Sequence, residues 1–196
     1  MAHGPTYKVK FRRRREGKTN YYKRYEYVKS KQIRCVIRKS NKYIWVQMIK
    51  LDPRGDVTIS SAHSSELKKF GYKGDLNNMC ASYLVGLLAG LRAKKMGINK
   101  AILDIGVYKN RAGTRLYSVL KGILDAGIDI PYDAAMLPNE DRTTCKHVSD
   151  YAKYLKANNL DKFNNVFSQY ISRGLDPENI VEHVKEVIEK IKGENS

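Results

Sequence analysis

The stretch DLNNMCASYLVGLLAGLRAKKM, residues 75–96, decides the fold because it carries the most regular helical pattern in the chain. Its apolar side chains recur at steps of three and four residues, which places them on one face of a helix. This regularity favours core packing over a ligand-binding stripe. Asp75 is the expected N-cap, and Gly97 is expected just beyond the C-terminal end. Gly86 and Gly90 lie one turn apart, and we expect them to let the helix approach a sheet closely.

Three strands are predicted before this helix, over 32–38, 43–50 and 56–60, where apolar and β-branched residues alternate or cluster. In the first strand, Arg34 and Arg38 alternate with core residues and would form a basic outer face. The turn before the third strand is expected at Asp52-Pro53-Arg54-Gly55. The short spacing predicts an antiparallel meander.

After the long helix come a short apolar strand at 101–105 and an amphipathic helix at 114–126. The order βββαβα predicts an α/β domain with a mixed β-sheet and packed helices, in the order that opens the ribonuclease-H-like fold. An irregular segment at 131–147 leads to three further helices, at 149–157, 160–173 and 177–191. We therefore predict a basic extended arm, an α/β globular domain and a helical C-terminal extension, over residues 1–30, 31–147 and 148–196.

The positive charge is concentrated at the N-terminal end. The whole chain of 196 residues has a net charge of +17, of which residues 1–40 contribute +12 through 14 basic and two acidic side chains. A large positive excess favours a polyanionic partner. Aromatic side chains that stack on unpaired bases are interleaved with these cations. This interleaving argues against a solvated basic tail or a localisation signal. The aromatic residues are Tyr7, Phe11, Tyr21, Tyr22, Tyr25 and Tyr27.

Composition excludes several other classes of protein. An apolar fraction of 42% supports a folded core, and no apolar run approaches the roughly 20 residues of a membrane span. Four consecutive arginines at 12–15 leave no apolar face for a membrane-surface helix. The three cysteines, Cys35, Cys80 and Cys145, are far apart and predict no disulfide framework and no metal site, which suits a reducing cytoplasm.

The ribonuclease-H-like order raises the hypothesis of a nuclease. Such enzymes need several carboxylates to hold two divalent ions, and only Asp104, on the fourth strand, matches. The segment Ser60–Glu66 contains a serine–histidine pair around His63 but has no nucleophile elbow or phosphate loop, so we interpret it as a polar loop that contacts backbone or phosphate. We therefore predict no enzyme activity and no cofactor.

Several motifs resemble, in family order, the family of large-subunit ribosomal protein eighteen. The arm carries RRREGKT at 13–19, and the body carries VIRKSN at 36–41, SAHSSEL at 61–67, YLVGLL at 83–88 and AILDIG at 101–106. The similarity continues through 120–122, 125–127 and 130–131. The length, with helices after 147, is similar to the long archaeal and eukaryotic form. Asn20 and Tyr132 depart from the pattern, where Asp and His are expected.

The resemblance implies a structural constituent of the large ribosomal subunit. Such a protein binds 5S rRNA in the central protuberance and links it to the large-subunit rRNA, beside neighbouring ribosomal proteins. It implies a cytoplasmic location on the ribosome, with no membrane and no small-molecule substrate. The alternatives are a general nucleic-acid-binding protein, such as a DNA-binding chromatin protein, an inactive nuclease-like RNA-binding domain, or a protein-only interaction module.

The candidate RNA-binding residues fall into three groups. The arm is expected to lack a core and to become ordered on RNA, its cations meeting phosphates and its tyrosines stacking. The sheet and the start of the helix at 114–126 would extend this surface. Tyr43 and Trp45 are expected to pack in the core or on the sheet rather than to stack on RNA. The predicted contacts are Lys8, Lys10, Arg12, Arg13, Arg14, Arg15, Lys18, Tyr21, Tyr22, Arg24, Arg34, Arg38, Asn41, Ser61, His63, Ser64, Lys109, Arg111 and Arg115.

Overall fold

The centre of the protein is a four-stranded mixed sheet. The computed structural model describes residues 4–52 and 54–195, with the side chain of residue 195 left out. Strands β1 (Arg34–Lys39), β2 (Ile44–Asp52), β3 (Gly55–His63) and β4 (Ile102–Asp104) lie in the order β3-β2-β1-β4. The first three form the predicted antiparallel meander, and β4 runs parallel to β1. The mixed α/β class is confirmed; Pro53 of the predicted turn lies outside the described residues.

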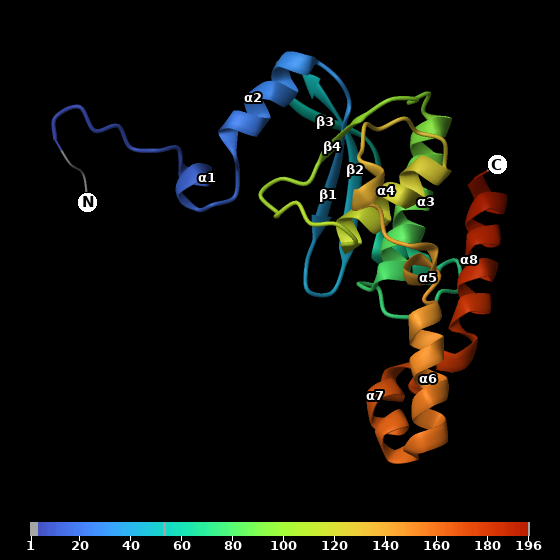
Figure 1. Ribbon diagram of the computed structural model, residues 1–196. Helices are drawn as coiled ribbons and strands as arrows, with labels where there is room; N and C mark the ends of the chain where they lie inside the picture. Colours follow the sequence, from blue (N-terminus) through green and yellow to red (C-terminus); the bar gives the residue numbers. More distant parts are fainter. Residues whose placement is uncertain (1–3, 53, 196) are drawn as a thin grey trace.

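The two faces of the sheet differ because side chains alternate along each strand. One face is apolar: Ile37, Val46 and Ala62 are fully buried. Helix α3 (Met79–Lys95) packs on this face against β2 and β3, and α4 (Arg115–Asp125) packs along α3 (Figure 1). The core predicted from the helical stripe at 75–96 is confirmed.

The ends and glycines of α3 differ in part from the prediction. Asn78 is the N-cap and accepts the backbone N–H of Ala81, while the Asp75 carboxylate accepts the N–H of Asn77 one turn earlier. Gly97 ends the helix as expected, with a φ of +76°. The predicted approach of Gly86 to a sheet is wrong, because this glycine faces α4 and an added Cβ there would overlap the carbonyl of Val119. Gly90 likewise meets Ile123 of α4 and Ala126, the residue just after it.

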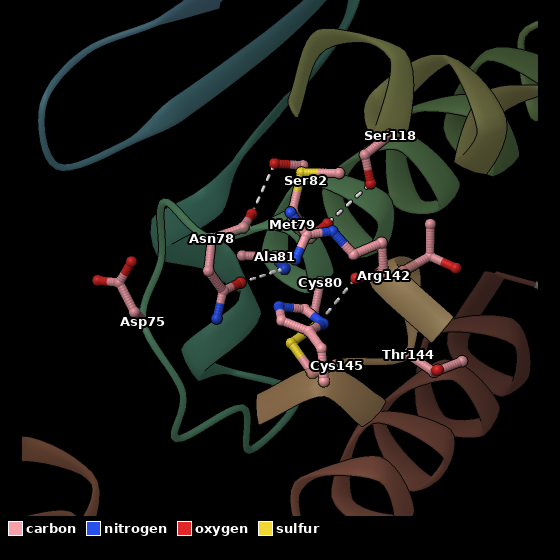
Figure 2. Close-up of a disulfide and its surroundings, with 12 residues drawn as sticks. Asp75, Asn78, Met79, Cys80, Ala81, Ser82, Ser118, Arg142, Thr144 and Cys145 are labelled. Carbon is pink, nitrogen blue, oxygen red and sulfur yellow. Dashed lines mark hydrogen bonds between the residues drawn. A yellow bond between two sulfur atoms is a disulfide. The ribbon is translucent and has the colours of Figure 1, made fainter. Parts of the chain in front are cut away.

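A disulfide joins α3 to the segment before α6 (Lys146–Asn158), and this corrects the prediction from the cysteine count. Cys80 and Cys145 are 65 residues apart in sequence, but their Cα atoms lie 5.9 Å apart. Figure 2 shows the pair between the first turn of α3 and the chain that follows α5 (Glu140–Thr143). Sequence spacing gave no signal because tertiary packing alone brings the two thiols together. The inference of a reducing compartment therefore loses its support from the cysteines.

The C-terminal helices belong to two cores. Helix α8 (Ile180–Asn195) follows a 3₁₀ turn that starts at Pro177 with Asp176 as its N-cap, and it packs on α3 within the main core. Helices α6 and α7 (Leu160–Ser172) form a hairpin that projects from the body (Figure 1). A second apolar cluster lies within this hairpin, made by Ala152, Leu155, Phe163 and Phe167. Among the described residues, no helix is both long and apolar enough to span a membrane.

The N-terminal arm is not fully extended. It contains the short helix α1 (Arg12–Arg15) and the ten-residue helix α2 (Tyr21–Ser30), neither of which buries a residue. Figure 1 shows α2 against the sheet, while the chain before it runs away from the body. The expectation of an arm without a core of its own agrees with this burial, but the extended conformation is wrong for residues 21–30. Asn20 provides the reason: it departs from the family pattern, and its side chain caps the first turn of α2.

Candidate nucleic-acid interface

Helix α2 is held on the sheet by specific contacts. The side chain of Asn20 accepts the backbone N–H groups of Tyr22 and Lys23, which fixes where the helix begins. Arg24 donates two hydrogen bonds to the carboxylate of Asp56, at 2.9 and 3.2 Å. The hydroxyl of Tyr27 donates to the carbonyl of Leu103 on β4 at 3.2 Å. These contacts place the cations of α2 beside those of β1.

Five charged side chains alternate in sign beneath α2. Asp56 accepts from Arg24 and also from Arg34, at 2.6 Å. Arg34 continues to Asp104 at 3.2 Å, and Asp104 is paired with Arg38 at 3.3 Å. The guanidinium of Arg38 also donates to the carbonyl of Asp104 at 2.8 Å. The chain of ion pairs therefore links the arm to three strands of the sheet.

This network corrects the prediction for Arg34. The residue is only 5% exposed, with both ends of its guanidinium held by carboxylates, and the ring of Tyr27 lies 6.0 Å from it. Arg34 is on the outer face, as the alternation predicted, but α2 covers that end of the face. It therefore positions α2 and does not present a free charge to a partner.

The position that a nuclease would use for metal is occupied by arginines. Asp104 is buried and accepts hydrogen bonds from Arg34, Arg38 and the backbone N–H of Gly106. Over the described ranges 4–52 and 54–195, no three His, Cys, Asp or Glu side chains lie together as metal ligands. At this site the carboxylate of Asp104 holds arginine side chains in place.

The acidity of these groups follows from their pairing. Burial raises the pKa of Asp56, but the hydrogen bonds from Arg24 and Arg34 outweigh it and hold the pKa below its ordinary value. The hydrogen bond between Arg24 and Asp56 also raises the pKa of Arg24. Burial against the sheet raises the pKa of the Tyr27 hydroxyl. All three groups keep their charge state near neutral pH.

A cavity of about 510 Å³ lies between the arm and the sheet. Its wall contains six cationic and two acidic side chains, so the net charge is +4. Both acids belong to the ion-pair network, and Tyr21 and Tyr27 add aromatic surface. Such a cavity attracts anions. The cations are Arg13, Lys18, Lys23, Arg24, Arg34 and Arg38.

The remaining predicted residues of the arm are on the surface. Lys8, Lys10 and the four arginines of α1 are exposed. Lys18 is paired with Glu16 at 2.9 Å in a solvent-exposed contact. Tyr22 is 72% exposed, and Arg14 lies 5.0 Å from its ring centre. The structure therefore leaves these cations and the ring of Tyr22 accessible to a partner.

The predicted polar loop at 60–65 is partly strand. Residues 60–63 complete β3, so Ser61 and His63 are on the outer face of the sheet. Ser64 is fully buried, and its hydroxyl accepts the backbone N–H of Ile44, so it is not available to RNA. Nδ1 of His63 lies 2.6 Å from the hydroxyl of Ser65 and accepts the backbone N–H of Ser65. The sequence alone could not distinguish this internal contact from a phosphate contact.

A second basic region surrounds the start of α4. Lys109 and Arg111 are exposed, and Arg115 is half-buried, donating to the carbonyl of Asn77 at 2.8 Å. These three line a groove of about 770 Å³ together with Lys39 from the end of β1. Asn41 is exposed in the β1–β2 turn, and its carbonyl accepts from Asn77. The fold thus brings this predicted group next to the sheet.

Sequence reasoning missed three functional features. Asp56 was not singled out, although it joins Arg24 to Arg34. Lys23 and Lys39 line the two cavities without having been named. Trp45 was expected in the core or on the sheet, and it lies on the outer face of the sheet with 51% exposure. The alternation of Trp45 with Ile44 and Val46 was the signal that placed it there.

Comparison with known proteins now defines the class. Residues 5–100, which hold the arm from residue 5 on, the sheet strands β1–β3 and the whole of α3, match the profile of the family described as "Ribosomal large subunit proteins 60S L5, and 50S L18". The chain therefore has the sequence pattern of a large-subunit ribosomal protein.

Curated relatives extend the match over both ends. Large ribosomal subunit protein uL18 of Metallosphaera sedula is 53% identical over 192 residues, 98% of each chain. The uL18 proteins of Saccharolobus solfataricus and Saccharolobus islandicus are 53% and 52% identical over 193 residues, 98% of this chain and 96% and 98% of theirs. The protein belongs to the uL18 family of large ribosomal subunit proteins, and the match includes the C-terminal helices.

Proposed function

We propose that this protein is a structural constituent of the large ribosomal subunit that binds 5S rRNA and links it to the large-subunit rRNA in the central protuberance. The observation that carries the proposal is the exposed positive charge of the arm, in a chain that belongs to the uL18 family. Arm cations neutralise phosphates, while α2 fixes their position on the sheet. The protein works by holding RNA and performs no chemistry.

The proposed interface has three parts. The residues before α2 supply free charge that becomes ordered between RNA helices. The cavity between α2 and β1 receives phosphate next to Arg24 and Arg38. The start of α4, with Lys109 and Arg111, meets a further phosphate where the helix dipole favours an anion. The C-terminal hairpin is proposed to contact neighbouring ribosomal proteins on the ribosome in the cytoplasm.

The test is the salt dependence of 5S rRNA binding. Affinity is measured at several salt concentrations for the full chain and for a variant with Arg12, Arg13, Arg14 and Arg15 all changed to Gln. Each phosphate contact releases counterions, so loss of four contacts flattens the slope of log affinity against log salt by roughly 3 units. A control variant carries Lys→Gln changes at Lys153, Lys162, Lys185 and Lys190, which remove equal charge from the C-terminal helices.

An equal loss of slope in both variants would show that net charge alone matters, and would contradict the role of the arm. Duplex DNA of matched length is used as the competitor. Equal affinity for this DNA and for 5S rRNA would favour a general nucleic-acid-binding protein instead.

A further inference from the structure

The outer face of the sheet carries an uncovered row of side chains next to α2. Arg38, Trp45 and His63 stand directly opposite one another across β1, β2 and β3. Residues that are opposite in register project from the same face. The row behind it contains Gln47 and Ser61. Helix α3 packs on the other face and α4 packs on α3, so among the described residues no helix covers this part of the sheet (Figure 1).

Trp45 is the most exposed ring of an aromatic cluster that His63 holds together. Its side chain is 51% exposed. The rings of Trp45 and His63 pack edge to face, with 5.3 Å between their centroids. Tyr43, which is 37% exposed, lies 5.0 Å from the same imidazole. Large aromatic side chains contribute most when they are buried, so an open cluster of three rings is surface that a partner can cover.

The charges around the cluster favour an anionic partner. Arg38 borders Trp45 in the row, and its side chain is 41% exposed even though it is paired with Asp104. Lys42, in the turn to β2, lies next to Tyr43 in the sequence. The neighbouring carboxylate of Glu66 is paired with Arg92 at 2.7 Å. The core of a protein–protein interface is depleted in charge, whereas a ring flanked by cations suits a nucleotide.

We propose that Trp45 stacks on an unpaired base of the bound RNA, with Arg38 beside the adjoining phosphate and Gln47 and Ser61 facing the edge of the base. The inference rests on the proposed RNA-binding function and adds a base-stacking site on the sheet to it. Single-stranded nucleotides are recognised by stacking on aromatic side chains that project from a sheet. The contribution differs from that of the arm because stacking releases no counterions.

Trp45 is the only tryptophan of the chain, so its fluorescence reports the site directly. The full-length protein is excited at a wavelength selective for tryptophan and titrated with a 5S rRNA transcript. Stacking quenches the emission with the same midpoint as binding. Trp45→Ala weakens the affinity by roughly 5- to 150-fold, the range for loss of one stacked base, while Trp45→Phe keeps most of it. The salt slope of both variants equals that of the unchanged protein.

The matched control is Tyr154→Ala, which removes another exposed aromatic side chain, 62% exposed on α6, and leaves the affinity unchanged. Circular dichroism verifies that each variant is folded. Unchanged emission at saturation together with full affinity of Trp45→Ala overturns the proposal and leaves 5S rRNA binding intact. A loss of affinity with a flatter salt slope also overturns it, since Trp45 would then only position cations. Absence of 5S rRNA binding by the unchanged protein rejects the proposed function and this inference with it.

Discussion

Arg34 and Asp104 form an ion pair of 3.2 Å between β1 and β4, with each side chain only 6% exposed. Each partner has a second charged contact, Arg34 with Asp56 and Asp104 with Arg38. A buried charge without a partner is costly, so the four groups depend on one another. The same contacts connect the arm to the sheet, because Asp56 also binds Arg24. Stability and the placement of the arm are therefore coupled.

Removal of the buried carboxylate is expected to destabilise the whole domain. Asp104→Asn leaves buried Arg34 with only one of its two carboxylate partners and removes the ion pair of Arg38, so the free energy of unfolding falls by up to about 3–5 kcal/mol. Urea unfolding followed by circular dichroism measures this. The control is Asp129→Asn. The side chain of Asp129 is 67% exposed, so its ion pair with Lys100 is expected to contribute less than about 1 kcal/mol. Equal effects of the two changes would refute the coupling.

The contact of Asp56 with Arg24 and Arg34 makes stability depend on pH. The pKa of Asp56 is lowered in the folded protein from an ordinary 3.8, so the contribution is fully present above that value. It is lost as the pH falls through the lowered folded pKa. Thermal unfolding of the unchanged protein and of Asp56→Asn is compared from pH 7 to pH 2.5. The difference in melting temperature should stay constant near neutral pH and shrink below about pH 4. A difference that grows on acidification would reverse the assigned sign.

The glycines between α3 and α4 are expected to tolerate no side chain. A Cβ at Gly86 would overlap the carbonyl of Val119, and one at Gly122 would overlap the carbonyl of Tyr83. Gly86→Ala therefore forces the helices apart and costs about 1–3 kcal/mol. Gly193→Ala, with open space around it in α8, is the control and should stabilise the helix by up to about 1 kcal/mol. Thermal unfolding measures both, and the two changes should have opposite signs.

Reduction of Cys80–Cys145 is expected to lower stability. The bond closes a loop of 65 residues, for which the chain-entropy relation gives about 4 kcal/mol. Unfolding is compared with and without a reductant, and with the double variant Cys80→Ala, Cys145→Ala, which should be insensitive to reductant. Thiol titration of the unfolded, unreduced protein should find one thiol, that of Cys35. Three thiols before reduction would show that the bond is absent.

The fold was predictable where local pattern and packing agree. The alternation in 32–38 and 43–50 and the stripe of 75–96 gave the strands and the long helix, because one face of each element is buried and must be apolar. The arm was also visible, since charge is a property of composition. Residues 21–30 were predicted as extended because they carry no apolar stripe. They form α2 because Asn20 caps the helix and because Arg24 and Tyr27 bind it to the sheet.

The candidate site was predictable in its chemistry but not in its pairing. Sequence named Arg34, Arg38 and Asp104 separately, and only the parallel pairing of β1 with β4 shows that they neutralise one another. Ser64 was named as a contact and is buried, because its hydroxyl serves the backbone of Ile44. Trp45 was expected to pack in the core or on the sheet and lies half-exposed on the sheet, since no helix of residues 4–52 and 54–195 covers that part of the outer face.

The sequence by itself determined that this is an α/β protein with +12 of its charge in the first 40 residues, because periodicity and charge are properties of the chain. Only the tertiary structure decided which of those cations are free. Arg34 is paired and buried, while the arginines of α1 are exposed, and that difference depends on carboxylates 22 and 70 residues away. Electrostatic interactions act through space, so a charge acquires its role only when the fold brings its neighbours to it.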